Sequence, residues 1–305
     1  MCGFLGSINF SNEENMKALS LIDHRGPDDK GYYEESVLFL GHTRLAIVDT
    51  SKAGHQPMFS KDRDLVIVFN GEIYNHMDIR EKLKYKYSFT SHSDTETILY
   101  GFLEFGVDLF DMLNGIFSLS IFNLKTKDLF LVRDHFGVKP FYYYNDNEKW
   151  IFGSEIKSML NYSGFNRTLS IEGLVNYINF LWSPGEVTPF LNVKKLLPGH
   201  YIKVNLQTPK IFAITKYYDI PYSGKYLLNS EDELIDMLDQ KIELAVSRQL
   251  MSDVPVGYFL SGGLDSSLIV AYARKLRPNE EIHCFTIDVG VDNVEEGFAD
   301  DLKYA

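Results

Sequence analysis

Short apolar runs separated by turn residues fill most of residues 1–200, and they limit the folds open to the chain. Each run has the length of a strand, and such runs between turns are typical of packed sheets. The five clearest candidates are residues 37–49, 64–75, 115–123, 128–134 and 150–155. We therefore expect a sheet-rich first domain.

One helix is expected among these strands, over residues 94–105. Ser93 is its predicted N-cap, Glu96 would complete a capping box, and Gly106 would end the helix. Apolar residues at helical spacing form its predicted buried stripe, which consists of Ile98, Leu99, Phe102 and Leu103.

The pattern changes after residue 205. Residues 206–229 are expected to be a connector that includes some strand, and Ser230 with Glu233 predicts the capped start of a second helix. The predicted buried face of that helix consists of Leu234, Leu238, Ile242, Ala245 and Leu250.

A strand, a glycine loop, a helix and a strand at 282–289 follow, which predicts a β-α-β unit and a parallel sheet. We expect one domain over 1–205, the connector over 206–229 and a second domain over 230–305. A single β-α-β unit cannot cover both faces of a parallel sheet, so the second domain is expected to be incomplete.

Charge and composition exclude several classes of partner. The net charge of −12 repels phosphate backbones, so no nucleic-acid partner is expected. The sequence has no apolar stretch of membrane-spanning length and no signal-peptide pattern at its start, which predicts a cytoplasmic protein without a membrane partner. The two cysteines argue against a disulfide framework. Cys284 lies in an apolar run and is expected to be an inert buried thiol, and the histidines show no metal-ligand spacing.

The loop "SGGLDSS" at 261–267 is the most specific motif. Its glycines let backbone N–H groups approach an anion, its serines add donors, and the N-terminus of the following helix favours negative charge. The alternative is a tight strand-to-helix turn in which the glycines are only permissive. The order strand, loop, helix favours a phosphate site, and the loop is not a Walker A motif.

Cys2 raises a second possibility at the start of the chain. Removal of Met1 would leave a thiol and a free α-amine on one residue, and the amine could accept the thiol proton near neutral pH. If Met1 is retained, Cys2 is an ordinary thiol near a chain end.

Polar residues beside the predicted strands would complement such a nucleophile. Asn70 and Gly71 could supply two donors to an oxyanion, while Arg44 and Asp94 suit the carboxylate and ammonium of an amino acid. Each also has a structural reading: Asn-Gly as a hairpin turn, Arg44 in a surface ion pair, and Asp94 at a helix start.

Ten ordered motifs make the chain resemble the glutamine-hydrolysing asparagine synthetases over nearly all of its length. They are MCGFLG, HRGPDD, GHTRLAIVD, QPM, FNGEIYN, SDTE, RDHFGVKPFYY, GSEIK, LLPGH and MSDVPVGYFLSGGLDSS. The resemblance implies a four-layer αββα sandwich of N-terminal-nucleophile hydrolases, followed by part of a parallel α/β domain with the PP-loop of ATP pyrophosphatases.

The resemblance also implies roles for individual residues. Cys2 would attack the side-chain amide of glutamine, with Asn70 and Gly71 as the oxyanion hole. The residues expected to bind glutamine are Arg44, Leu45, Ala46, Ile47, Val48, Asn70, Gly71, Glu72 and Asp94. Those expected to bind ATP are Leu260, Ser261, Gly262, Gly263, Asp265, Ser266 and Ile287, with Asp265 as a Mg²⁺ ligand.

The implied substrates are glutamine, ATP and aspartate, with Mg²⁺ expected, no prosthetic group, and a homodimer or a full-length chain as partner. By this hypothesis ammonia from glutamine amidates an adenylated aspartate, and this chain by itself makes no asparagine. Two alternatives stay open: an amidotransferase with another acceptor, such as an antibiotic or a surface polysaccharide, and a non-catalytic remnant that binds glutamine or a partner.

Overall fold

A computed structural model describes residues 1–146, 148–210, 212–222, 224, 229–287 and 305. Its internal contacts divide the chain into two compact units, Met1–Pro221 and Tyr222–Ala305. The division falls inside the segment expected to be a connector. None of the helices among the described residues combines the length and apolar character needed to cross a bilayer.

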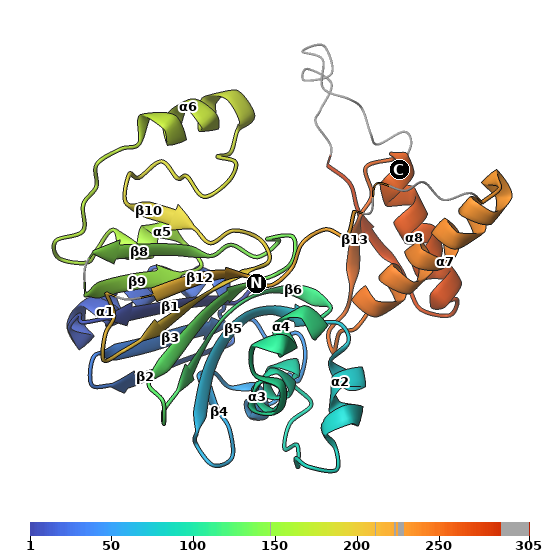
Figure 1. Ribbon diagram of the computed structural model, residues 1–305. Helices are drawn as coiled ribbons and strands as arrows, with labels where there is room; N and C mark the ends of the chain where they lie inside the picture. The colour runs from blue at the N-terminus through green and yellow to red at the C-terminus, as the bar shows by residue number, and fades with distance from the viewer. Residues whose placement is uncertain (147, 211, 223, 225–228, 288–304) are drawn as a thin grey trace. The chain divides into compact units, whose positions relative to one another are not determined.

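Two antiparallel sheets make up the centre of the first unit (Figure 1). The first has the order β10-β8-β9-β1-β3-β2. Its strands are β1 Gly3–Ile8, β2 Asp29–Glu35, β3 Leu38–Arg44, β8 Tyr142–Asp146, β9 Lys149–Gly153 and β10 Val193–Lys195.

The second sheet has the order β12-β11-β7-β6-β5-β4. Its strands are β4 Met58–Phe59, β5 Leu65–Ile73, β6 Gly115–Asn123, β7 Asp128–Arg133, β11 His200–Asn205 and β12 Phe212–Lys216. All five strands expected from the sequence are present, and β3 is the one most shortened, because the chain leaves the sheet after Arg44.

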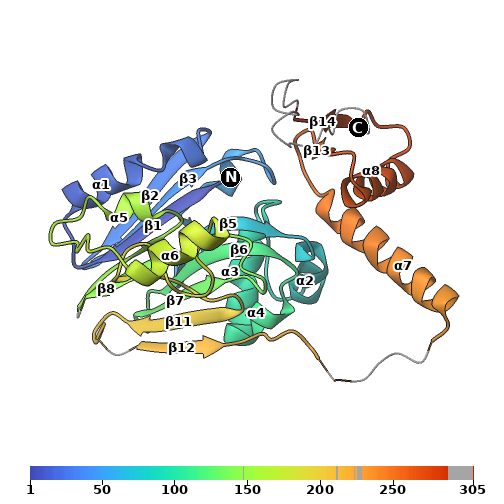
Figure 2. The same cartoon turned by 90° about the horizontal axis from the view of Figure 1, so that it is seen from above.

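Helices cover the outer face of each sheet (Figure 2). On the first sheet lie α1 Asn12–Ser20 and α5 Ile156–Met159, and on the second lie α2 His76–Leu83, α3 Asp94–Phe105 and α4 Leu109–Met112. The remaining helical segments of this unit are α6 Ile171–Phe180 and the 3₁₀ turns η1 Asp23–Arg25, η2 Lys52–Gly54 and η3 Gly106–Asp108.

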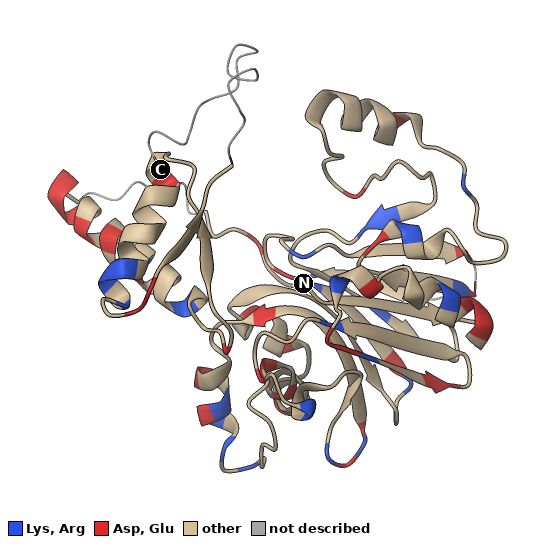
Figure 3. Ribbon diagram, turned by 180° about the vertical axis from the view of Figure 1, so that it is seen from behind, with Lys and Arg blue, Asp and Glu red and all other residues tan. Residues whose placement is uncertain are grey.

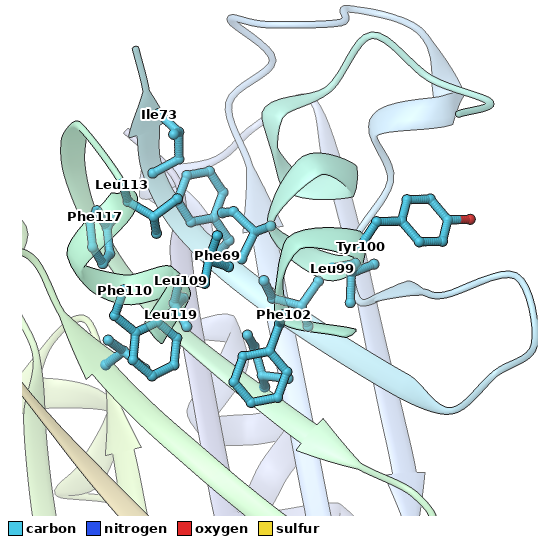
Figure 4. Close-up of a cluster of buried hydrophobic side chains, with 14 of the residues drawn as sticks. Phe69, Ile73, Leu99, Tyr100, Phe102, Leu109, Phe110, Leu113, Phe117 and Leu119 are labelled. Carbon is cyan, nitrogen blue, oxygen red and sulfur yellow. The ribbon is translucent and has the colours of Figure 1, made fainter. Parts of the chain in front are cut away.

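Three hydrophobic clusters hold these layers together. One lies between the two sheets, one lies under α1 and α5, and one lies under α2, α3 and α4, where Leu99, Phe110 and Phe117 point toward one another (Figure 4). All six residues of β1 are buried, because both faces of its sheet are covered. The four-layer αββα sandwich expected from the sequence is confirmed.

Helix α3 has the predicted bounds and the predicted cap, since the Ser93 side chain accepts from Thr95 N. Two details of the prediction are wrong. Glu96 forms no capping box, because its carboxylate accepts from the backbone N–H groups of Thr90 and Ser91 in the preceding loop. Leu103 is 37% exposed and lies outside the buried stripe.

The second unit contains α7 Glu231–Gln249, β13 Gly257–Phe259, α8 Leu264–Leu276 and β14 His283–Phe285. Strands β13 and β14 pair in parallel, as expected, and positions 288 and 289 of the predicted last strand lie outside the described residues. The capping box of Ser230 and Glu233 is confirmed, and Figure 3 shows the acidic first turn of α7 in red.

The predicted burial within this unit is partly wrong. Leu234, Leu238 and Ala245 are exposed, and Val246, which was not predicted, is the buried residue of α7. Leu250, the C-cap of the helix, is buried as predicted. Within the described part of this unit α7 packs on α8, so a single stripe of it is covered. Cys284 is exposed rather than buried, because among the residues that the structure describes no layer covers the faces of β14.

Candidate active site

Cys2 stands immediately before β1, the strand that lies between β9 and β3 in the first sheet. Its thiol faces the backbone of Leu45: Leu45 N–H donates to Sγ, and Sγ also lies 3.4 Å from Leu45 O. Arg25 Nε donates to Cys2 O over 2.9 Å. The turn after β3 thus holds the thiol, and Arg25 holds the backbone of Cys2.

The thiol opens onto a cavity of about 40 Å³ between the ends of the two sheets. Nine of the ten residues predicted for this site line it, namely Cys2, Arg44, Leu45, Ile47, Val48, Asn70, Gly71, Glu72 and Asp94. Ala46 is the exception, since it does not line the cavity and its N–H donates to Asp28 Oδ2 over 2.8 Å.

Asn70 and Gly71 lie inside strand β5, paired with Ser118 and Phe117 of β6, and not in a hairpin turn. The Asn70 side chain is buried, and neither its Oδ1 nor its Nδ2 has a hydrogen-bond partner among the described residues. A Cβ at Gly71 would lie 2.1 Å from Ile116 O, so the strand has room for glycine alone. The site therefore contains the Asn70 amide without a hydrogen-bond partner, next to the backbone of Gly71, which carries no side chain.

Two carboxylates face the same cavity. Asp94 Oδ2 accepts from Ile73 N–H over 2.9 Å, and burial raises the pKa of Asp94 to about 6. Burial, and then repulsion from Asp94, raises the pKa of Glu72 to about 7. At pH 7 Asp94 is therefore mostly charged and Glu72 is about half charged. Together the two carboxylates favour a cation in the cavity.

Arg44 is buried and holds the loop that follows β3. Its Nη1 donates to Ser51 O over 2.9 Å, and its Nη2 donates to the carbonyls of Val48 and Asp49. These bonds fold residues 45–49 over the cavity, which is why the strand is shorter than predicted. Arg44 lines the cavity and has N–H groups left for an anion, because a guanidinium carries five.

The ionisation of the thiol and of the chain's amine is shaped by burial. Burial raises the pKa of the Cys2 thiol, and the hydrogen bond from Leu45 N–H opposes this effect. Burial first, and then the charges of Arg25 and Lys139, lowers the pKa of the Met1 amine. The site therefore favours a protonated thiol and a neutral amine. The thiol becomes a nucleophile only when a base accepts its proton, and the amine is such a base.

Several residues that line the cavity were not predicted for this site, and two of them, Lys139 and Gln56, have polar side chains that bear on its chemistry. Lys139 is 7% exposed, and its Nζ lies 3.1 Å from Met1 Sδ. Gln56 Oε1 accepts from Phe69 N–H over 2.7 Å, which fixes β5 one residue before Asn70. Both residues stand in motifs that the resemblance used, but no role was assigned to either.

The glycine loop lies at the C-terminal end of β13, where α8 begins with Gly263 as its N-cap. Leu260 N–H donates to Phe285 O over 2.9 Å, which joins the ends of the two strands. Ser266 Oγ accepts from Ser261 N–H, and Gly262 has a φ of +69°. The exposed loop thus brings its serines and the helix N-terminus to one place.

The other two residues predicted for nucleotide binding are also exposed: Ile287 just beyond β14 and Asp265 in the first turn of α8. The described residues contain no cluster of three or more His, Cys, Asp or Glu that could hold a metal ion. Asp265 is a single carboxylate, which suits Mg²⁺ only where phosphates and water complete its shell.

Two protein-family models match the chain. A glutamine amidotransferase domain matches residues 1–218, and an asparagine synthase domain matches residues 237–305.

Curated relatives carry names that agree with these families. Asparagine synthetase [glutamine-hydrolyzing] 1 of Bacillus subtilis is 35% identical over 98% of this chain and 47% of the relative. A putative asparagine synthetase [glutamine-hydrolyzing] 2 of Methanocaldococcus jannaschii is 35% identical over 94% of this chain and 59% of the relative. The chain thus spans about half the length of these relatives.

Among solved structures, glutamine phosphoribosylpyrophosphate amidotransferase from B. subtilis matches with a TM-score of 0.53 and 14% identity, over 98% of this chain and 71% of that one. At this identity the match speaks for the fold alone.

Proposed function

The chain belongs to the glutamine amidotransferase domain family, and from this membership we propose that its first unit hydrolyses the side-chain amide of glutamine. One observation carries the proposal: the Cys2 thiol opens onto a cavity that also holds the unpartnered Asn70 amide and two carboxylates. That is a nucleophile, an oxyanion donor and a cation site within one small space.

In the proposed reaction Met1 is first removed, so that Cys2 carries the α-amine. The thiol proton moves to that amine, and the sulfur adds to the amide carbon of glutamine. The C–N bond then breaks, and the proton held by the amine leaves with the nitrogen as ammonia. Water cleaves the glutamyl thioester in the same manner, which releases glutamate and restores the thiol.

Asn70 and Gly71 would stabilise the oxyanion formed at each addition. The Asn70 Nδ2 group has no partner among the described residues, so it needs no rearrangement before it donates. Donors that are fixed in advance in this way contribute about 2.7–4 kcal/mol each in acyl transfer. Gly71 would add its backbone N–H.

The remaining residues would hold the amino-acid end of glutamine. Glu72 and Asp94 suit its ammonium, and the free N–H groups of Arg44 suit its carboxylate. The loop over Leu45, Ala46, Ile47 and Val48 would contribute backbone groups. A carboxylate pair and an arginine that line one cavity would select a zwitterion.

For the second unit we propose ATP binding at the glycine loop and a place in asparagine synthesis, with aspartate as acceptor. The match of residues 237–305 to the asparagine synthase family supports this, as does the junction of β13 with α8. Residues 1–205 would be the glutaminase domain, 206–229 the connector and 230–305 the start of the ATP domain, in a cytoplasmic enzyme. When Mg²⁺ is bound, it would neutralise charge on the phosphates, with Asp265 as its protein ligand.

A different acceptor is the second candidate. Two relatives, at 32% identity each, are named amidases rather than asparagine synthetases: Amidase chyE of Penicillium rubens and Amidase chry2 of Gibberella zeae. Exchange of pyrophosphate into ATP in the presence of different acids would separate aspartate from other acceptors.

Glutamate release from glutamine tests the glutaminase proposal. The protein should release glutamate, and Cys2→Ala should reduce the rate by at least about 10³-fold, because the nucleophile is lost. Cys284→Ser is the matched control and should keep the full rate, since that exposed thiol lies in the other unit.

Two results would contradict the proposal: no glutamate release by a protein whose mass shows that Met1 has been removed, or equal rates for the protein and Cys2→Ala. Retention of Met1 in the mature protein would instead support the non-catalytic alternative.

A further inference from the structure

Lys139 is a buried lysine whose ammonium lies beside the first residue of the chain. It is 7% exposed, and its Nζ lies 3.1 Å from Met1 Sδ. It lines the same cavity as Cys2, yet the proposed function gives it no role.

The position of Lys139 is fixed by its own backbone. Its N–H donates to Asp134 Oδ2 over 2.9 Å, and its carbonyl accepts from Arg133 Nε over 2.9 Å. The Asp134 carboxylate also accepts from the N–H groups of Phe136 and Val138. The turn from 134 to 139 therefore aims the side chain into the cavity.

The charge of Lys139 is not neutralised by a contact. Within the described residues its Nζ has Met1 Sδ as its one hydrogen-bond partner and forms no ion pair. Arg25, another cation near the terminus, differs in this respect, because its Nη1 lies 2.9 Å from Glu155 Oε1. Burial lowers the pKa of Lys139, and the charge of Glu72 opposes this effect. In its charged form the ammonium repels any further positive charge nearby.

Groups from every segment around the cavity act on the terminal amine and on the thiol. They are Arg25 of η1, Asp28 before β2, Arg44 of β3, Glu72 of β5, Asp94 of α3 and Lys139 after β7. The three carboxylates favour a protonated amine, and the three cations oppose it. Of the cations, Arg25 is paired with Glu155 and Arg44 binds its own loop.

We propose that Lys139 is a positioning residue of the glutaminase reaction, whose buried ammonium keeps the α-amine of Cys2 neutral and ready to accept the thiol proton. The inference rests on the proposed function. Loss of Met1 removes the sulfur in contact with Nζ, and the ammonium then shares one cavity with the newly exposed amine. A like charge in the same cavity disfavours protonation of that amine, so more of the protein holds a working base at neutral pH.

Titration of the amine itself tests this inference without reference to catalysis. Cys2→Ala protein is made behind a cleavable leader, so that residue 2 begins the chain and no thiol competes. The rate of acetylation of the terminal amine by acetic anhydride is followed from pH 5.5 to 9 by mass spectrometry of the first peptide.

Lys139→Met should raise the midpoint of this titration by about one pH unit, and Lys139→Gln should do the same. Lys139→Arg keeps the charge and should keep the midpoint. Lys203→Met is the matched control, because Lys203 is an exposed residue of β11 that pairs with Asp128 of β7, and it should leave the midpoint unchanged.

Equal midpoints in the parent, Lys139→Met and Lys139→Gln proteins would overturn the inference, as would a Lys139→Arg midpoint that moves as far as that of Lys139→Met. Glutamate release by the unmodified protein is measured alongside. Release without a midpoint shift refutes the role of Lys139 alone, whereas a processed protein that releases no glutamate refutes the glutaminase proposal whatever the midpoint does.

Discussion

The chemistry of the cavity depends on single side chains that the fold leaves unsatisfied. Asn70 is the clearest case: its amide is 1% exposed and has no partner among the described residues. Such a group costs about 1–3 kcal/mol when it is left without a hydrogen bond. A bound carboxamide would give the Asn70 amide its missing hydrogen bond and remove this cost. The unpaired amide therefore favours binding of a carboxamide at this position.

Glu72 gives the site a predicted pH dependence. Its raised pKa of about 7 means that it is mostly neutral at pH 6 and mostly charged at pH 8. Only the charged form attracts the ammonium of glutamine, so affinity should rise with pH through 7. Calorimetry on Cys2→Ala protein should show glutamine binding up to about tenfold tighter at pH 8 than at pH 6.

In Glu72→Gln, made in the same Cys2→Ala protein, the change between pH 6 and pH 8 should fall to about the twofold expected from Asp94, whose pKa is about 6. Glu13→Gln is a suitable control, because Glu13 pairs with Lys17 on the surface of α1. A larger dependence that persists without Glu72 would show that a further group titrates.

The sequence indicated most of the cavity residues but not all. Cys2, Asn70 and Asp94 stand in motifs with an evident chemical use, and the structure brings them to one cavity. Lys139 was missed because a lysine in a turn after a strand usually lies on the surface. Only the turn around Asp134 shows that this lysine points inward.

At the scale of elements, the turn from 134 to 139 supports both the fold and the site. The Asp134 carboxylate is fully buried and accepts from four backbone N–H groups, those of Phe117, Phe136, Val138 and Lys139. Asp134→Ala should lower the free energy of unfolding by about 3 kcal/mol, because buried donors lose a charged acceptor.

Chemical denaturation measures this loss, and glutamate release should fall with it because Lys139 is displaced. Glu13→Ala, at an exposed ion pair, should change stability by less than about 1 kcal/mol. A stable and fully active Asp134→Ala protein would contradict the role given to this turn.

The elements themselves were largely predictable, because strands and helices follow local patterns. Helix α3 and strand β6 have the predicted bounds. Burial was less predictable, since it depends on the partner: Leu238 has helical spacing but faces away from α8, and Cys284 lies on an uncovered strand. The capping box predicted for Glu96 also failed for a reason that the sequence does not show. The backbone N–H of Thr90, in the loop before α3, donates to the Glu96 carboxylate instead.

At the scale of the molecule, the two units differ in how much core they contain. Among the described residues, three clusters of buried side chains lie within Met1–Pro221, whereas the second unit has one, which consists of Val246, Leu250, Tyr272 and Ala273. We expect residues 1–221 made alone to unfold cooperatively and to keep the rate of glutamate release. Residues 222–305 made alone should show no cooperative thermal transition, because so small a core rarely suffices. Calorimetry and the activity assay check both, and an aggregated or inactive 1–221 fragment would contradict this view.

The contact between the Met1 sulfur and the Lys139 ammonium has a practical consequence. By the proposed mechanism, a chain that keeps Met1 has no free α-amine on Cys2, so an aminopeptidase, rather than folding, would supply the base. An affinity tag fused in front of Cys2 would then keep the protein from releasing glutamate.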